Sequence, residues 1–196
     1  MFILYAVLIG LVLGFALGGR LIGLATIQFR WPWLAIGGFA VQLLLFSDAV
    51  SATIGAAGPP IYVASTVAVL AAVVRNIRVP GLAVVAAGAA SNLVAIVANN
   101  GFMPASAGAF DALGRGPSAG YTNSALLEAP AFEALTDLYA LPTWLPFANV
   151  FSIGDVLIAL GVIVVLVAGM RARTLRGDRY GRAALDGPAA VETPGP

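Results

Sequence analysis

The residues of this chain that could carry chemistry are a few polar side chains set inside long apolar segments. At about 1.5 Å per helical residue, Gln42 and Asn92 lie roughly 10 Å, and Asp155 about 6 Å, inside the same side of three such segments. An ionisable residue there is a functional candidate by default, because an uncompensated charge is costly in an apolar span. Four further polar residues lie at the ends of the segments: Asn99, Asn100, Asn149 and Ser152. We expect these seven residues, the outer polar cluster, to line an outward-facing binding pocket.

The same residues have a structural interpretation that stays open. The run from Ser152 to Asp155 fits the S-x-x-D/E pattern of a capping box, in which a hydroxyl and a carboxylate satisfy the first N–H groups of a helix. Gln42 and Asn92 are equally suited to join helices by hydrogen bonds worth about 1 kcal/mol each. No second carboxylate stands at a defined spacing in the cluster, which weakens a general acid and base mechanism. We therefore predict no catalytic residue.

Composition restricts the class of protein. Hydrophobic residues make up 60% of the chain, charged residues 10%, and the mean hydropathy is +0.96. These values are typical of an integral membrane protein. The chain contains neither His nor Cys, so the commonest metal ligands are missing, and we expect no metal site and no cofactor. Nothing in the charge pattern indicates nucleic-acid binding.

Five segments approach the length of about 20 residues that a membrane-spanning helix needs. They lie near residues 2–19, 31–49, 59–74, 79–98 and 151–170. We predict an all-α integral membrane protein with about five transmembrane helices in a single domain, 1–182, followed by a disordered cytoplasmic tail at 183–196. Two alternatives remain: the first segment as a signal peptide, although it lacks a basic start, and the second as a re-entrant segment, because it contains Gly37, Gly38 and Gln42.

Arginines give the expected orientation, because the chain has no Lys. Nine of the ten lie close to ends of apolar segments: Arg20, Arg30, Arg75, Arg78, Arg171, Arg173, Arg176, Arg179 and Arg182. Under the positive-inside rule, these ends are cytoplasmic and the N-terminus is outside. The basic run 171–182 serves as stop-transfer charge or binds anionic lipid. Arg115 is the exception, and on the outer side it is a candidate to pair with a carboxylate or an anionic ligand.

The long external segment 99–150 is predicted to be a lid. Within it, residues 131–140 show helical spacing, with Phe132, Leu135, Leu138 and Tyr139 on one side and Glu133 and Asp137 on the other. This pattern predicts a short amphipathic helix that lies on the membrane surface or across the mouth of the bundle.

Small residues form stripes along two of the spans. Gly10, Gly14 and Gly18 are four residues apart in the first span, and Ala83, Ala87, Ser91 and Ala95 repeat the spacing in the fourth. Such stripes allow helices to approach closely. They indicate packing within the bundle or, alternatively, a homodimer.

Three stretches together suggest a family. The chain has Gly18-Gly19-Arg20 after its first span, Asn-Asn-Gly-Phe-Met-Pro at 99–104, and Asn-Val-Phe-Ser-Ile-Gly-Asp at 149–155. In these it resembles an uncharacterised family of bacterial multipass membrane proteins, known only as a domain of unknown function. The resemblance implies a bacterial plasma membrane and brings no assigned activity, substrate or cofactor. At Asn100 the resemblance leads us to expect Gly.

Three classes of function are compatible with these features. We favour a multipass plasma-membrane protein that binds, through its outer pocket, a lipid headgroup, a small solute or a partner protein. The alternatives are an intramembrane enzyme acting on a lipid-linked substrate and a small oligomeric transporter. The sequence shows no inverted repeat or pair of broken helices typical of transporters, and no nucleophile or metal set.

Overall fold

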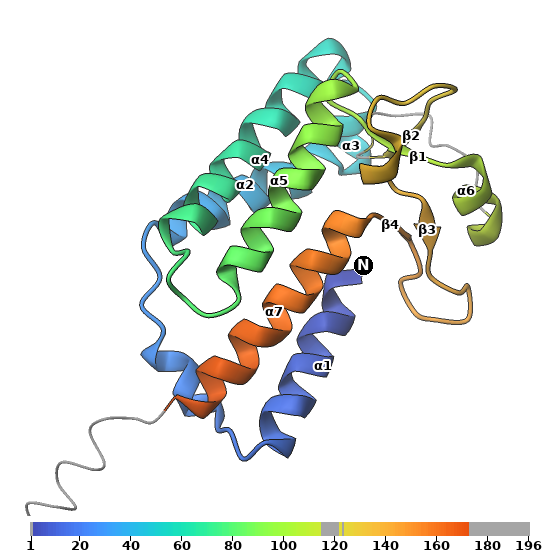
Figure 1. Ribbon diagram of the computed structural model, residues 1–196. Coiled ribbons are helices and arrows are strands. Elements are labelled where there is room, and N and C mark those ends of the chain that lie inside the picture. Colours follow the sequence, from blue (N-terminus) through green and yellow to red (C-terminus); the bar gives the residue numbers. More distant parts are fainter. Residues whose placement is uncertain (1, 115–121, 123, 173–196) are drawn as a thin grey trace, which may run out of the picture.

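Five long apolar helices form the body of the protein in the computed structural model, which describes residues 2–114, 122 and 124–172 (Figure 1). They are α1 (Phe2–Ala16), α2 (Pro32–Leu45), α4 (Gly58–Arg75), α5 (Leu82–Ala98) and α7 (Ile153–Arg171). Each helix lies within or close to one predicted segment. Two stretches, Gly55–Arg75 and Ile153–Arg171, are long and apolar enough to cross a membrane, and α1, α2 and α5 are shorter apolar helices.

Two of the shorter helices, α1 and α2, end before their predicted boundaries for local reasons. In α1, Gly18 adopts a left-handed backbone with φ of 77°. The N–H groups of Gly18 and Gly19 donate to Phe15 O at 2.9 Å and Gly14 O at 2.8 Å, which is the Schellman arrangement that terminates helices. After α2, Ser47 has an extended backbone and a separate turn, α3 (Asp48–Ser51), follows. Two 3₁₀ helices, η1 (Leu21–Thr26) and η2 (Gly55–Ala57), complete the connections.

The helices lie in an order that differs from their order along the chain. Packed neighbours follow the sequence α1, α7, α5, α4, α2, so the first and last helices are in contact (Figure 1). Five arginines lie at or just beyond one set of helix ends: Arg20, Arg30, Arg75, Arg78 and Arg171. We call this the arginine end of the molecule. The opposite end carries the start of α1, the start of α7 and the segment between α5 and α7.

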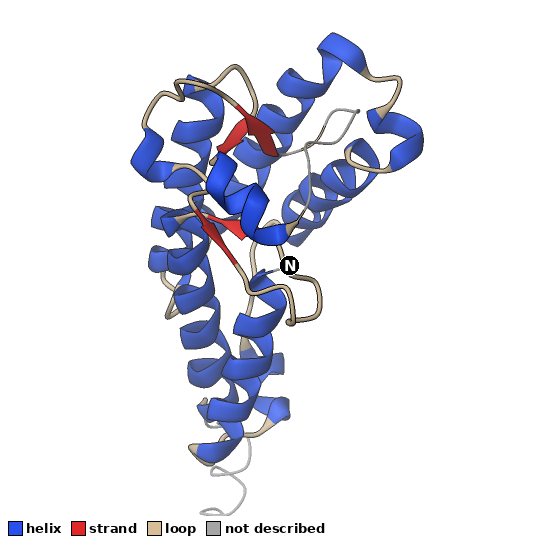
Figure 2. Ribbon diagram, turned by 90° about the vertical axis from the view of Figure 1, so that its right-hand side faces the viewer, coloured by secondary structure: helices blue, strands red, loops and turns tan. Residues whose placement is uncertain are grey.

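That segment, the lid (residues 99–151), contains strands as well as helix. Strand β1 (Met103–Ala105) pairs in parallel with β2 (Ser124–Leu126), and β3 (Tyr139–Ala140) pairs antiparallel with β4 (Val150–Phe151). A short helix, α6 (Ala107–Leu113), follows β1. Figure 2 shows both sheets and α6 together on one side of the helices. The expectation of an all-α protein is therefore wrong in the lid.

The predicted amphipathic helix at 131–140 is also wrong. Only Glu133–Leu135 form a single 3₁₀ turn, η3, and Thr136 after it is extended. Asp137, expected on a solvated face, is 4% exposed and forms a β-bridge with Ala105. Backbone pairing with a distant strand replaces the helix, and side-chain periodicity carries no information about such pairing.

The contact between α5 and α7 depends on two facing pairs of glycines. A Cβ built on Gly161 would lie 2.7 Å from Gly81 O, and one built on Gly154 would lie 2.8 Å from Gly88 O. The pairs are two helical turns apart on each chain segment. Because any side chain at these positions would collide with backbone, the glycines allow the two helices to approach more closely than other residues would.

The glycine stripe of α1 also packs within the bundle. A Cβ on Gly10 would lie 2.8 Å from Leu166 Cδ1, and one on Gly14 would lie 2.9 Å from Met170 Cε, both on α7. Gly18 has nothing within 4 Å and instead terminates the helix. On α5, Ala83 and Ala87 are exposed. The intramolecular interpretation of the α1 stripe thus holds, and a homodimer stays a prediction.

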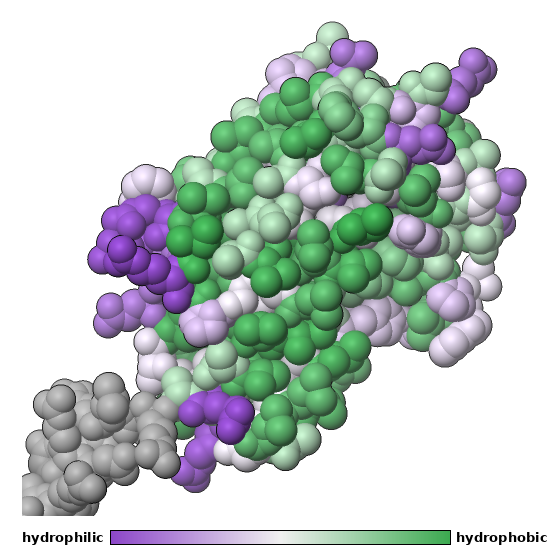
Figure 3. All heavy atoms as spheres, viewed as in Figure 1, coloured by the Kyte–Doolittle hydropathy of each residue, from purple (hydrophilic) through white to green (hydrophobic). Residues whose placement is uncertain are grey.

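Large apolar side chains remain on the outside of the helices. Leu8 is 59% exposed, Phe39 55% and Leu43 72%. Figure 3 shows this hydrophobic surface over the helices, with the hydrophilic residues gathered mostly toward the ends of the molecule. An apolar surface of this extent marks contact with lipid or protein rather than water.

The glycine contacts make a direct prediction. Gly161→Ala should lower the free energy of unfolding by about 1–3 kcal/mol, because the new methyl group meets backbone atoms that cannot move independently. Gly37→Ala in α2 is the matched control, since nothing lies within 4 Å of its Cβ position and alanine favours helix by up to about 1 kcal/mol. Thermal unfolding in detergent micelles measures both. Equal melting temperatures for the two variants would contradict the packing argument.

Candidate functional site

The start of α7 is held by a closed set of hydrogen bonds that joins it to α5. Ser152 Oγ accepts from Asp155 N at 3.1 Å, and Asp155 Oδ2 accepts from Ser152 N at 3.0 Å, which completes a capping box. From α5, Asn92 Nδ2 donates to Asp155 Oδ1 at 2.8 Å, and Ser152 Oγ donates to Asn92 Oδ1 at 2.8 Å. Both oxygens of Asp155 therefore accept hydrogen bonds, and Ser152 is completely buried.

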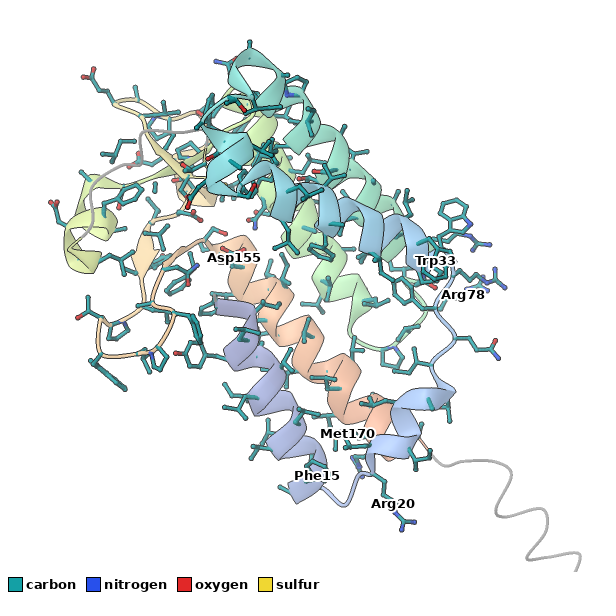
Figure 4. The ribbon with its side chains drawn as sticks, turned by 180° about the vertical axis from the view of Figure 1, so that it is seen from behind. Phe15, Arg20, Trp33, Arg78, Asp155 and Met170 are labelled. Atoms are coloured by element: carbon teal, nitrogen blue, oxygen red, sulfur yellow. The ribbon has the colours of Figure 1, made fainter. Side chains whose placement is uncertain are left out.

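This geometry bears out the capping interpretation of Asp155. The carboxylate caps the first turn of α7 and fixes the amide of Asn92, as the capping pattern predicts. Figure 4 places Asp155 at the end of the bundle opposite Arg20 and Arg78. Both carboxylate oxygens accept hydrogen bonds here, so use of Asp155 as a base would require these bonds to break.

A second carboxylate, which the sequence did not indicate, lies in the same region. Asp137 is buried, and its Oδ2 accepts from Ser124 Oγ at 3.1 Å. Its backbone is fixed to β1, because Asp137 N donates to Pro104 O at 2.9 Å and Asp137 O accepts from Ser106 N at 3.1 Å. Nothing in the local pattern could have identified Asp137, since its burial comes from this distant pairing.

Burial gives the Asp137 carboxyl an unusual protonation equilibrium. Desolvation, together with the charge of Asp155, raises the pKa of Asp137 from 3.8 to about 7, and the hydrogen bond from Ser124 acts in the opposite direction. None of these influences is a cation. The carboxyl is therefore partly protonated near neutral pH. Because Asp137 lies in the lid and Asp155 lies in α7, the effect of the Asp155 charge on this pKa depends on how the lid is placed against α7.

Asn99 attaches the lid to the end of α5. Its Nδ2 donates to Ala95 O at 2.8 Å and to Ala131 O at 2.9 Å, while its Oδ1 accepts from Ala131 N at 2.9 Å. The side chain thus pairs with a lid backbone much as a strand would. Asn100 follows with φ of 57°, a left-handed conformation that asparagine tolerates better than most residues, so the turn forms without the expected glycine.

The predicted outer polar cluster is only partly brought together. Gln42 lies in a different interface, where its Nε2 donates to Ser65 Oγ and Thr66 Oγ1, both at 3.3 Å, between α2 and α4. Asn149 Nδ2 donates to Val150 O at 2.9 Å beside the start of α7. Arg115 lies outside the described residues. The sequence thus grouped Asn92, Ser152 and Asp155 correctly. It placed Gln42 with them because all lie at a similar depth, but depth in a span does not show which helices are neighbours.

A cavity lies in the lid itself, away from the predicted residues. The lid cavity has a volume of about 560 Å³ and lies between the β1–α6 junction and residues 126–138. Its lining combines the side chains of Leu126, Leu127 and Leu138 with the carboxylates of Glu128 and Glu133. None of the predicted cluster residues lines it. The volume is in the range that holds small ligands.

Comparison with known proteins identifies the family. The model of a family of unknown function (DUF5317) matches residues 26–167. The chain belongs to this family. No curated protein and no solved structure matches it. The predicted membership of an uncharacterised family is thereby confirmed, and two of the three stretches on which it was based, 99–104 and 149–155, lie within the matched residues.

The residues that match DUF5317 contain most of the elements described above. They include α2, α4 and α5, the whole lid and nearly all of α7. Within the described residues, no group of three or more His, Cys, Asp and Glu side chains could hold a metal ion. At its lid end the described part of the chain offers hydrogen-bonding groups, the carboxyl groups of Asp137 and Asp155, and a cavity lined by leucines and glutamates.

The pKa of Asp137 makes stability depend on pH. Between pH 3.8 and about 7 the native state holds a proton that the unfolded chain releases, so stability falls as pH rises through that interval. We expect the wild type to lose on the order of 4 kcal/mol of unfolding free energy across it, at 1.36 kcal/mol per pKa unit. Asp137→Asn should abolish this loss.

Chemical denaturation between pH 4 and pH 8 measures the effect. Asp111→Asn is the matched control, because Asp111 is exposed on α6 of the same lid, and it should keep the wild-type pH dependence. A wild type and an Asp137→Asn variant with parallel stability profiles would show that the carboxyl does not titrate in this interval.

Proposed function

We propose that the protein is a multipass protein of the bacterial plasma membrane, with five spans, its N-terminus and lid outside and its C-terminus in the cytoplasm. The position of Arg20 and Arg78 at the end of the bundle opposite Asp155 supports this orientation. The exposed apolar surface of the helices supports insertion. Trp33, 80% exposed near the arginine end, and Trp144, 79% exposed in the lid, suit the two membrane interfaces.

Its proposed role is to bind a ligand on the outer face, and the observation that carries this proposal is the lid cavity. Leucines form much of the lining, and Glu128 and Glu133 add two negative charges. A ligand complementary to these groups has an apolar part and a cationic group, because apolar burial supplies affinity and the carboxylates select charge. The lid cavity thus replaces the outer polar cluster as the proposed binding site.

Binding is favoured over conversion of the ligand by the state of the polar groups. Asp155 is engaged in the capping box and in the hydrogen bond from Asn92. Asp137 accepts a hydrogen bond from Ser124 and is buried within the lid. Neither residue lines the cavity. The acidic residues that do line it, Glu128 and Glu133, are exposed, and we assign them to recognition of a cationic group and not to catalysis.

The orientation is tested by cysteine accessibility, for which the chain is suited because it has no Cys. Ala107→Cys, exposed on α6, should react with a membrane-impermeant maleimide in intact cells. Ala25→Cys, exposed in η1 at the arginine end, should react only after the membrane is permeabilised. The reverse pattern, or labelling of both in intact cells, would overturn the proposed topology.

Ligand binding is tested with a matched pair of arginine substitutions in α6. Ala107 lines the lid cavity, whereas Ala112 is exposed on the same helix outside it. Native mass spectrometry after gentle lipid extraction should find a retained molecule on the wild type and on Ala112→Arg. Ala107→Arg should lose it, because the new side chain occupies the cavity and neutralises its carboxylates. Retention of the molecule by both variants would reject the cavity as the site. Failure to find it on the wild type and on both variants would reject it as well.

A further inference from the structure

A second, larger cavity lies at the arginine end and has the opposite charge. This basic groove has a volume of about 750 Å³, and its lining includes Arg30, Arg75 and Arg78 together with Trp31. The arginines come from two separate places in the chain, the approach to α2 and the turn after α4. Their convergence on one cavity is a property of the fold, since the positive-inside pattern requires only that they lie on the same side of the membrane.

A buried amide fixes the two walls of the groove to each other. Asn76, 5% exposed, accepts from Arg30 N at 2.6 Å through Oδ1 and donates to Arg30 O at 2.6 Å through Nδ2. The same Nδ2 donates to Ala72 O at 2.7 Å in the last turn of α4. The backbone of Arg30 is therefore held against the end of α4, which bears Arg75. A preorganised wall of this kind lowers the entropic cost of binding.

Trp31 is held in an uncommon conformation beside these charges. Its backbone lies in the left-handed region, with φ of 58° and ψ of 43°, directly before Pro32. Left-handed backbone at a bulky residue is a genuine outlier, and such conformations cluster at functional sites. The conformation brings the indole within 5.8 Å of the Arg75 guanidinium carbon, measured to the ring centroid. Both residues of this cation–π pair line the groove, so an aromatic surface lies next to its charges.

The charge of the groove has no counterpart among its own lining residues. No Asp or Glu lines it. The described carboxylates all lie in α3, in the lid or at the start of α7: Asp48, Asp111, Glu128, Glu133, Asp137 and Asp155. Three guanidinium groups around one cavity therefore favour an anion, and arginine forks match phosphate oxygens in geometry as well as charge.

We infer that the basic groove binds the phosphate of an anionic phospholipid headgroup. Free phosphate offers the same chemistry, but the rest of the lining favours a lipid, because Val74, Ile77 and Val79 provide apolar surface next to the arginines. The indole of Trp31 suits the interface between headgroup and acyl chain. This inference rests on the membrane insertion proposed above, and it concerns a different site from the lid cavity and from the basic run that follows α7.

The test compares two arginines of the same end. Arg78 lines the groove, whereas Arg20 lies beside η1 and does not (Figure 4). Binding of phosphatidylglycerol to the full-length protein in micelles is measured by native mass spectrometry over a lipid titration. Arg78→Gln should weaken the tightest association about tenfold or more, because a charge-assisted hydrogen bond is lost. Arg20→Gln should change this association less than about threefold. The basic run that follows α7 is the same in every variant, so it does not account for a difference between them.

Trp31 and Trp33 give a second matched pair. Trp31→Ala should weaken phosphatidylglycerol binding, whereas Trp33→Ala should not, since Trp33 does not line the groove. Circular dichroism spectra that match the wild type show that Arg78→Gln and Trp31→Ala keep the fold, so that weaker binding reports on the groove. Arg78→Lys keeps the charge without the fork and should restore part of the affinity.

Other outcomes would overturn the inference. Equal weakening by Arg20→Gln and Arg78→Gln would mean that lipid responds only to the total charge of this end. Stabilisation by inorganic phosphate that depends on Arg78, with none by phosphatidylglycerol, would replace the lipid with a soluble anion. If cysteine labelling supports the topology while lipid binding is independent of Arg78, the groove fails and the proposed topology stands.

Discussion

Close contact between the backbones of α5 and α7 is the constraint on which both ends of the molecule depend. The two glycine pairs, Gly81 with Gly161 and Gly88 with Gly154, allow this contact. At one end it brings Asn92 next to the capping box, where Asn92 donates to Asp155 and accepts from Ser152. Toward the other end it places Gly81, which follows the turn after α4, against Gly161 and Val165 of α7. A wider separation would break the hydrogen bonds that Asn92 makes with Asp155 and Ser152, at a cost of about 1–3 kcal/mol for each bond.

Two asparagines at helix ends make the same arrangement of hydrogen bonds. Asn76 follows α4 and Asn99 follows α5, and each donates to the carbonyl oxygen four residues earlier. Each then exchanges a pair of hydrogen bonds with the backbone of a distant residue, Arg30 in one case and Ala131 in the other. The primary amide is suited to this task because it offers a donor and an acceptor in one plane. The two clamps position the basic groove and the lid.

The molecule is electrically divided between its two ends. Guanidinium groups converge on the groove, whereas carboxylates gather in and under the lid. The apolar helices between them separate the two sets of charge. The two proposed binding sites follow this division, with an anion at the arginine end and a cationic ligand in the lid. The raised pKa of Asp137 adds a pH-sensitive group within the lid.

The sequence by itself determined the apolar helices, the side on which the arginines lie and the capping box, because composition, charge and local hydrogen bonding are encoded within a few residues. It also indicated the family through 99–104 and 149–155. Only the tertiary structure decided that Asp137 is buried, that residues 131–140 do not form a helix and that Gln42 is separate from Asn92. It also decided that Arg30 and Arg78 share a cavity. Each of these results depends on pairing between segments far apart in the chain, and such pairing is set by packing and backbone hydrogen bonds that leave no periodic signal in the sequence.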